Sequence, residues 1–180
     1  MKKLLLFCGL PGSGKTTISR ELCRVTKAHL IDLDDFKKTD VDPATVTSQI
    51  DPPDVRWRYY QKGISEALRL FENGIQTIVV DEVFHLKELR SRIDSFCLEH
   101  GITVFWIEVS CPYNIVEKRL LSKPRVGHIL SSTEALAMYQ MFAEIFEPFS
   151  TDSGHIVIEN INSDLAFRAV TTILKEISRE

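Results

Sequence analysis

The sequence has no long hydrophobic run, and this absence argues against two kinds of segment. After Lys2 and Lys3 the apolar stretch extends only from Leu4 to Cys8, whereas the core of a secretory signal needs about 7–15 apolar residues. No later segment approaches the roughly 20 apolar residues of a membrane-spanning helix. We therefore expect a cytoplasmic protein without a membrane partner, and we interpret the opening run as a buried strand.

Cysteine is scarce, and neither sign of charge is in large excess. The four cysteines are scattered, without a Cys-x-x-Cys pair or histidines at zinc-binding spacing, so they are expected to be reduced buried thiols. The chain has 22 basic and 25 acidic residues and a net charge of −3. No overall positive field therefore attracts nucleic acid or anionic lipid. Nucleic acid is possible through a local basic cleft, but a small-molecule partner is favoured.

Short apolar runs alternate with amphipathic stretches along the whole chain of 180 residues, which is long enough for one domain with a substantial core. The predicted strands are residues 3–9, 28–34, 75–81, 102–110 and 155–160. The predicted helices are residues 15–27, 55–74, 86–101, 112–122, 132–147 and 163–178, with a loop at 37–54 that contains three prolines. This alternation predicts an α/β fold, a doubly wound parallel five-stranded sheet with helices on both faces.

A glycine-rich segment, "GLPGSGKTT", follows the first predicted strand and opens the first predicted helix. It fits G-x-x-x-x-G-K-[ST], the pattern of a phosphate-binding loop (P-loop, or Walker A motif). Glycines let backbone N–H groups wrap phosphate oxygens, the lysine reaches the β- and γ-phosphates, and the threonine hydroxyl binds Mg²⁺. The predicted ATP·Mg²⁺ site comprises Gly9, Leu10, Pro11, Gly12, Ser13, Gly14, Lys15, Thr16 and Thr17, with Thr16 as a magnesium ligand.

Missing motifs narrow the class of nucleotide-binding protein. A GTPase needs an Asn-Lys-x-Asp guanine reader, and the segment "NINSD" at 160–164 has isoleucine in place of the lysine. A transporter ATPase needs an LSGGQ-like signature, which the chain lacks. The chain is also too short for the helical lid domain of AAA+ motors. A kinase remains the favoured class.

Acidic residues follow the next two predicted strands. Asp32, Asp34 and Asp35 lie at the end of the second strand, and Asp81 and Glu82 at the end of the third. Ligands of open α/β sheets bind beyond these strand ends, and phosphoryl transfer needs a carboxylate to take the acceptor's proton. Alternation along a strand would place Asp32 and Asp34 on one face. Asp34 is the candidate base and Asp81 the candidate Mg²⁺-associated carboxylate; helix capping is the alternative.

Five blocks resemble, in order, a group of small P-loop kinases. The group includes polynucleotide 5′-kinases, zeta-toxin-like kinases and uncharacterised AAA-type predicted ATP-binding kinases. The blocks are "GLPGSGKTT", "IDLDDFKK", "VVDEVFHLKELR", "CPYNIVEKRLLSKPR" and "MYQMFAEIFEP". The resemblance implies a strand order of 2-3-1-4-5, Asp34 as general base, and Lys37 as a residue that holds the acceptor. Polynucleotide kinases typically carry arginine at the position of Lys37. Lysine cannot form the same bidentate contact, so the difference weakens the assignment of a polynucleotide substrate.

The fourth block is similar to a kinase lid, here about residues 112–132. The resemblance implies that Arg119 reaches the transferring phosphoryl group. The next lid cation would be Lys123, or Arg125 with a shift of two residues; the alternative is that they are solvated surface charges.

Two arginines on predicted helices each have two interpretations. Arg56 is a candidate acceptor-binding residue, although the neighbouring Trp57, Tyr60 and Ile64 have the spacing of a packing face. The resemblance implies that Arg90 lies near the acceptor, whereas the default interpretation is a surface residue on a helix. Together these features predict a single-domain (1–180) kinase that transfers the γ-phosphoryl group of ATP·Mg²⁺ to a hydroxyl or phosphate group of a small metabolite or nucleotide. A polynucleotide 5′-hydroxyl kinase and a non-catalytic nucleotide-binding regulator remain as alternatives.

Overall fold

The computed structural model describes residues 1–40, 50–122, 131–150, 154–161 and 165–178. Within these residues five parallel strands form one sheet in the order β2-β3-β1-β4-β5, which confirms the predicted fold class and strand order. The strands are β1 (Lys2–Cys8), β2 (His29–Asp32), β3 (Thr77–Asp81), β4 (Ile102–Ser110) and β5 (Ile156–Glu159). The helices are α1 (Lys15–Thr26), α2 (Leu33–Asp40), α3 (Pro53–Glu72), α4 (Lys87–Glu99), α5 (Tyr113–Ser122), α6 (Ser132–Ile145) and α7 (Leu165–Ile177).

The opening apolar run is the central strand of the sheet. Leu5 of β1 lies opposite Val79 of β3 on one side and Phe105 of β4 on the other. Leu4 and Leu6 belong to one core cluster, whereas Leu5 belongs to the cluster on the opposite face. The strand is apolar on both faces because both faces are covered.

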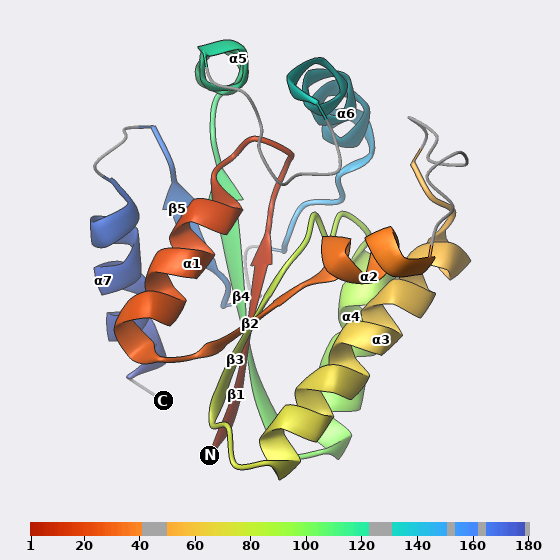
Figure 1. Cartoon of the computed structure of the whole chain (residues 1–180), viewed down its shortest axis with the longest axis vertical. Helices are drawn as coiled ribbons and strands as arrows, with labels where there is room; N and C mark the ends of the chain where they lie inside the picture. Colours follow the sequence, from red (N-terminus) through yellow and green to blue (C-terminus); the bar gives the residue numbers. More distant parts are fainter. Residues whose placement is uncertain (41–49, 123–130, 151–153, 162–164, 179–180) are drawn as a thin grey trace.

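Two pairs of helices cover the sheet (Figure 1). Helices α1 and α7 lie over one face, where Ile18 and Ile173 are among the buried residues. Helices α3 and α4 lie over the other face. The predicted packing face of α3 is confirmed, because Tyr60 and Ile64 are buried and Trp57 packs against the same cluster.

The prediction for the segment after β2 is wrong. The strand ends at Asp32 and helix α2 begins at Leu33, so Asp32 and Asp34 do not share a strand face. Asp32 Oδ1 accepts a hydrogen bond from the Asp34 main-chain N–H at 3.0 Å, the contact that a helix-capping residue makes. Leu33 is buried against Gly63 of α3. Capping together with burial of Leu33 therefore favours a helix here. The predicted loop at 37–54 also contains the end of α2 and the start of α3, and residues 41–49 lie outside the described residues.

Helices α5 and α6 lie beyond the carboxyl ends of the strands (Figure 1). They share a small core of their own that includes Cys111, Val116 and Ala135. The Tyr139 hydroxyl of α6 donates to the main-chain oxygen of Cys111 at 3.2 Å, which joins the helix to the end of β4. Helix α5, which is part of the predicted lid segment, thus packs with α6 as a layer beyond the sheet, and residues 123–130 of that segment lie outside the described residues.

Two further observations bear on the chemistry of the chain. All four cysteines are free thiols, three of them buried and Cys23 partly exposed. In the described part of the chain, no helix combines the length and the apolar character needed to cross a membrane.

Candidate active site

The loop between β1 and α1 has the backbone conformation that its glycines allow. Gly9, Gly12 and Gly14 have φ angles of +138°, +78° and +95°, in a region that other residues rarely adopt. Gly14 is the N-cap of α1, and its oxygen accepts hydrogen bonds from the N–H groups of Thr17 and Ile18. The loop therefore delivers backbone N–H groups to a helix N-terminus, an arrangement suited to binding an anion.

The same loop is tightly enclosed by its protein neighbours. A β-carbon on Gly9 would lie 2.2 Å from the main-chain oxygen of Val109 in β4. A β-carbon on Gly12 would lie 2.6 Å from Cγ1 of Val116 in α5. These glycines are therefore required by the packing of β4 and α5 as well as by any ligand.

Lys15, at the start of α1, directs its ammonium group across the loop. Its Nζ donates to the main-chain oxygens of Gly9 at 2.8 Å and Leu10 at 3.2 Å, and only 8% of the residue is exposed. The Lys15 ammonium group is thus buried against main-chain oxygens of the loop, and its lysine stands at the position that the motif specifies.

Asp81 ends β3 beside the loop and is buried. Ser19 Oγ lies 3.5 Å from its Oδ2, and the Thr16 side chain also forms a hydrogen bond with it. Burial raises the pKa of Asp81 to about 6, against the opposing effects of the Lys15 charge and the Thr16 hydrogen bond. Mg²⁺ prefers such oxygen ligands, and a divalent cation would stabilise the buried carboxylate. The residues therefore fit the magnesium site predicted from Thr16 and Asp81.

Glu82, the next residue, is a functional candidate to which the sequence analysis assigned no role. Its side chain, 5% exposed, forms an ion pair and hydrogen bond with Lys37 and lies 3.8 Å from Nη1 of Arg56. It also accepts the Val83 main-chain N–H at 2.8 Å. Burial opposes ionisation, but the charges of Lys37 and Arg56 outweigh it and hold the pKa of Glu82 below its usual range. Glu82 is therefore a buried carboxylate shared by two cations.

Asp34 and Lys37, on successive turns of α2, extend this network toward solvent. Lys37 Nζ lies 3.2 Å from Asp34 Oδ1, so the ammonium group bridges Asp34 and Glu82. The Asp34 side chain is 42% exposed and that of Lys37 is 17% exposed. Burial lowers the pKa of Lys37, but Glu82 and Asp34 raise it by more, so the side chain stays charged. The structure thus places the accessible carboxylate of Asp34 next to a fixed cation.

Arg56, at the start of α3, lies beside Glu82 of this network and is 4% exposed. Its guanidinium group lies over the ring of Phe142, 4.9 Å from the centroid. Five buried polar atoms make no hydrogen bond among the described residues. Four of them lie here, namely Nε and Nη1 of Arg56, the hydroxyl of Tyr60 and Nδ1 of His85, and the fifth is Oγ of Ser13 in the phosphate loop. Burial and the charge of Arg56 lower the pKa of His85 to about 4, so its ring is neutral near pH 7. Buried groups of this kind normally find a partner in water or a ligand.

The interpretation of Arg90 as a surface residue is wrong. Arg90 is 4% exposed and donates to the main-chain oxygens of Phe84 at 2.8 Å and Glu147 at 2.7 Å. Its guanidinium group also lies over the ring of Phe149. Arg90 therefore joins the loop after β3 to the segment after α6.

Of the three predicted lid cations, the structure describes only Arg119. Arg119, on α5, donates from Nη1 to the sulfur of Cys111 at 3.3 Å. Lys123 and Arg125 lie outside the described residues.

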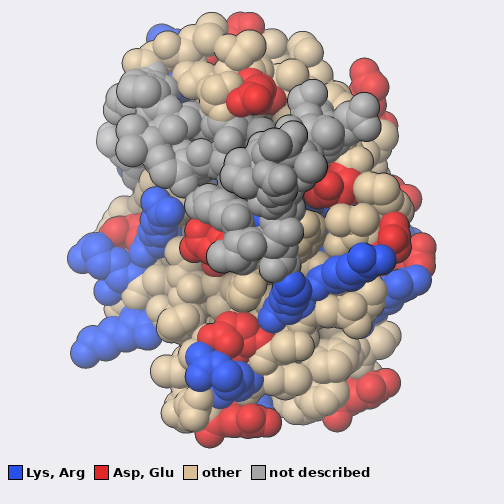
Figure 2. Space-filling model, turned by 45° about the vertical axis from the view of Figure 1, so that its right-hand side comes forward, with Lys and Arg blue, Asp and Glu red and all other residues tan. Residues whose placement is uncertain are grey.

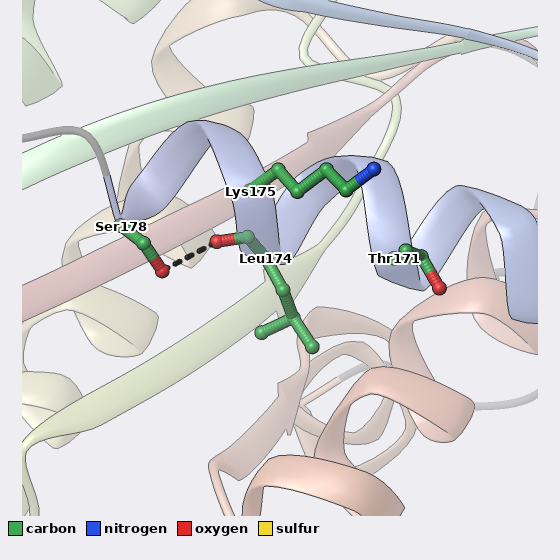
Figure 3. Close-up of a pocket in the computed structure, with 4 residues that line it drawn as sticks. All are labelled: Thr171, Leu174, Lys175 and Ser178. Atoms are coloured by element: carbon green, nitrogen blue, oxygen red, sulfur yellow. Dashed lines mark hydrogen bonds between the residues drawn. The ribbon is translucent and has the colours of Figure 1, made fainter.

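On the face shown in Figure 2, basic and acidic side chains are interspersed over the described part of the surface. A shallow hollow on α7 is lined by Thr171, Leu174, Lys175 and Ser178 (Figure 3). The Ser178 hydroxyl there donates to the oxygen of Leu174 at 2.6 Å, so it is already satisfied. This hollow lies on the helix that runs back toward the amino ends of the strands, away from the phosphate loop (Figure 1).

Comparison with protein families gives one result that covers most of the chain. A family model described as an AAA domain matches residues 4–148. No curated protein matches the chain.

Solved structures with the same fold extend over nearly the whole chain. A sugar kinase from Janibacter sp. HTCC2649 has a TM-score of 0.72 at 20% identity, covering 99% of this chain and 95% of its own. The Mycobacterium tuberculosis APS kinase CysC, in complex with AMPPNP and APS, has a TM-score of 0.68 at 18% identity and covers 98% of both chains. A gluconokinase from Sinorhizobium meliloti 1021 has a TM-score of 0.66 at 14% identity, covering 98% of this chain and 92% of its own. At these identities the likeness establishes a shared fold.

Proposed function

The chain belongs to the AAA domain family and has the fold of small P-loop kinases, and from this premise we propose that it is an ATP-dependent kinase. The reaction transfers the γ-phosphoryl group of ATP·Mg²⁺ to a hydroxyl group of a small metabolite or nucleotide. The observation that carries the proposal is the loop from Gly9 to Thr16, which contains three glycines with positive φ angles and buries the ammonium group of Lys15 against the Gly9 and Leu10 oxygens. The sugar kinase, gluconokinase and APS kinase names of the similar structures support a small acceptor.

The triphosphate binds in the loop. Its oxygens take the place of the Gly9 and Leu10 carbonyls as partners of Lys15 Nζ, and the N–H groups at the start of α1 bind the phosphates. Thr16 and Asp81 would hold Mg²⁺, which would neutralise part of the charge of the phosphates.

The acceptor binds on the α2 side of the loop. Asp34 orients the acceptor hydroxyl group and takes its proton, because its carboxylate is the accessible one of the Asp34–Lys37–Glu82 network. Lys37 and Arg56 bind polar groups of the acceptor. Arg119, with Lys123 or Arg125, neutralises charge that develops on the transferring phosphoryl group, and the lid of residues 112–132 excludes water. We further propose that residues 1–180 form a single domain and that the protein acts in the cytoplasm.

Titration of the chain with the non-hydrolysable analogue AMPPNP and Mg²⁺ tests the nucleotide site. The parent protein should bind, and Lys15→Ala should bind at least tenfold more weakly, because the buried cation that faces the phosphates is lost. Lys175→Ala on α7 is the matched control and should bind like the parent. A parent protein that does not bind AMPPNP·Mg²⁺ contradicts the proposal.

Acceptor-dependent release of ADP, measured across a panel of hydroxylated metabolites and nucleotides, tests the transfer. Asp34→Asn should bind AMPPNP normally but lose transfer, whereas Asp35→Asn, one residue along the same helix, should retain it. A labelled oligonucleotide with a 5′-hydroxyl group tests the polynucleotide alternative in the same assay. Normal transfer by Asp34→Asn would show that Asp34 is not the base.

A further inference from the structure

Asn160, directly after β5, is a buried polar residue that the proposed reaction does not use. It is 8% exposed, and its main-chain N–H donates to the Ser110 oxygen at 2.8 Å, which extends the pairing of β5 with β4. Its side-chain Nδ2 donates to the main-chain oxygen of Ser13 at 2.7 Å. A side chain from the edge strand of the sheet thus reaches into the phosphate loop.

This hydrogen bond fixes the orientation of one peptide unit of the loop. In a trans peptide the C=O of Ser13 and the N–H of Gly14 point in opposite directions, and the described chain has no cis peptide. Because Asn160 holds the Ser13 oxygen on its own side, the Gly14 N–H points to the opposite side. That N–H makes no hydrogen bond with the described residues, so it is available to a ligand.

The fit between Asn160 and the loop is close. A β-carbon on Gly14 would lie 2.1 Å from Nδ2 of Asn160, so the backbone can approach the amide only because residue 14 is glycine. The Ser13 oxygen can only accept a hydrogen bond, and the group that faces it must therefore be a donor. Glycine at position 14 and a donor at position 160 depend on each other.

We infer that Asn160 is a positioning residue for the nucleotide, which holds the Ser13–Gly14 peptide with its N–H directed at the phosphates. The inference rests on the proposed function, because it assumes that the loop binds a triphosphate. A carboxylate of the same shape cannot do this, since it would set an acceptor against the Ser13 oxygen and add a negative charge near the phosphates.

The test compares the parent protein with Asn160→Asp for binding of AMPPNP·Mg²⁺ by calorimetry at pH 8. The Kd of the variant should be at least tenfold higher. The ratio of the variant's Kd to the parent's should then fall as the pH is lowered toward 5, because a protonated carboxyl group can again donate to the Ser13 oxygen. A merely structural role would not produce this recovery. Asn73→Asp, the same substitution at an exposed helix end, is the control and should keep the parent's Kd.

The outcomes separate the inference from the proposed function. If the parent does not bind AMPPNP·Mg²⁺, the proposed function fails, and the inference with it. If the parent binds and Asn160→Asp stays within threefold of it at pH 8, or is weakened by the same factor at every pH, only the inference is overturned. Asn160→Ala should show a similar weakening with a native circular dichroism spectrum. Loss of folding in both variants would assign Asn160 to core stability and overturn the inference as well.

Discussion

Replacing Glu82 with glutamine is the perturbation that most directly tests the buried ion network. The substitution keeps the shape of the side chain and an oxygen that can accept the Val83 N–H. It removes the negative charge that faces Lys37 and Arg56, both of which have little exposure to solvent. Arg56 is then left without the carboxylate beside it, whereas Lys37 retains Asp34.

The expected loss of stability is large for a change of one atom. Removing one partner of a buried ion pair costs about 3–5 kcal/mol. We expect about 3 kcal/mol here, at the low end of that range, because the amide oxygen can keep the Val83 N–H and because Lys37 keeps a second carboxylate, although the amide NH2 group then faces the Lys37 ammonium. In a chain of this length about 1 kcal/mol corresponds to roughly 2–4 °C, so the melting temperature should fall by roughly 6–12 °C.

The loss should depend on pH in a defined direction. Lys37 and Arg56 hold the folded-state pKa of Glu82 below its unfolded value. The stabilisation by Glu82 is therefore complete above the unfolded pKa of about 4.3 and disappears as the pH falls through the folded value. The stability gap between parent and variant should be constant between pH 7 and about 5.5 and should narrow toward pH 4 and below.

Urea unfolding at several pH values measures this gap. Glu88→Gln is the control, because Glu88 forms an exposed pair with Arg92 on α4, and it should change stability by no more than about 0.5 kcal/mol. A loss below about 1 kcal/mol for Glu82→Gln at pH 7, or a gap that does not narrow in acid, would refute the reasoning.

Three more predictions concern other buried contacts. Gly63→Ala should lower the free energy of unfolding, measured in urea, by about 1–3 kcal/mol, because the added β-carbon would lie 2.4 Å from Cδ2 of Leu33. An unchanged free energy of unfolding would contradict close packing of Leu33 against α3. Arg90→Lys should cost about 2 kcal/mol or more by calorimetry, since one ammonium group cannot reach all the main-chain oxygens that the guanidinium binds; parent-like stability would contradict this. His85, with its pKa lowered to about 4, should stay neutral, so its NMR ring signals should not shift between pH 8 and about 5.5; a midpoint near 6.5 would show that the ring is solvated.

The phosphate loop and the sheet could be predicted from the sequence because their signals are local. Eight consecutive residues specify the loop, and its conformation depends on glycines at fixed positions within it. The strands are recognisable because a strand buried on both faces must be apolar throughout, as Leu4 to Cys8 is. The resemblance to small P-loop kinases added the strand order, which local patterns do not contain.

The start of α2 shows where local patterns are insufficient. "IDLDDF" alternates like a strand, but the chain turns into a helix after Asp32 because Leu33 packs near Gly63, a residue of another helix. The alternation of apolar and polar residues correctly indicates a half-buried segment. Over so few residues it does not distinguish the two-residue repeat of a strand from the repeat of a helix.

The sequence by itself determined that a strand leads into a glycine-rich loop with the P-loop pattern and that carboxylates follow the neighbouring strands. Only the tertiary structure decided that Glu82 joins Lys37 to Arg56, that Arg90 is buried, and that Asn160 holds the loop. These contacts join residues 45 positions apart, as for Lys37 and Glu82, or 147 apart, as for Ser13 and Asn160. The partner of a buried polar group is chosen by which elements the fold brings together, and hydrogen bonding in the interior then makes that choice energetically important.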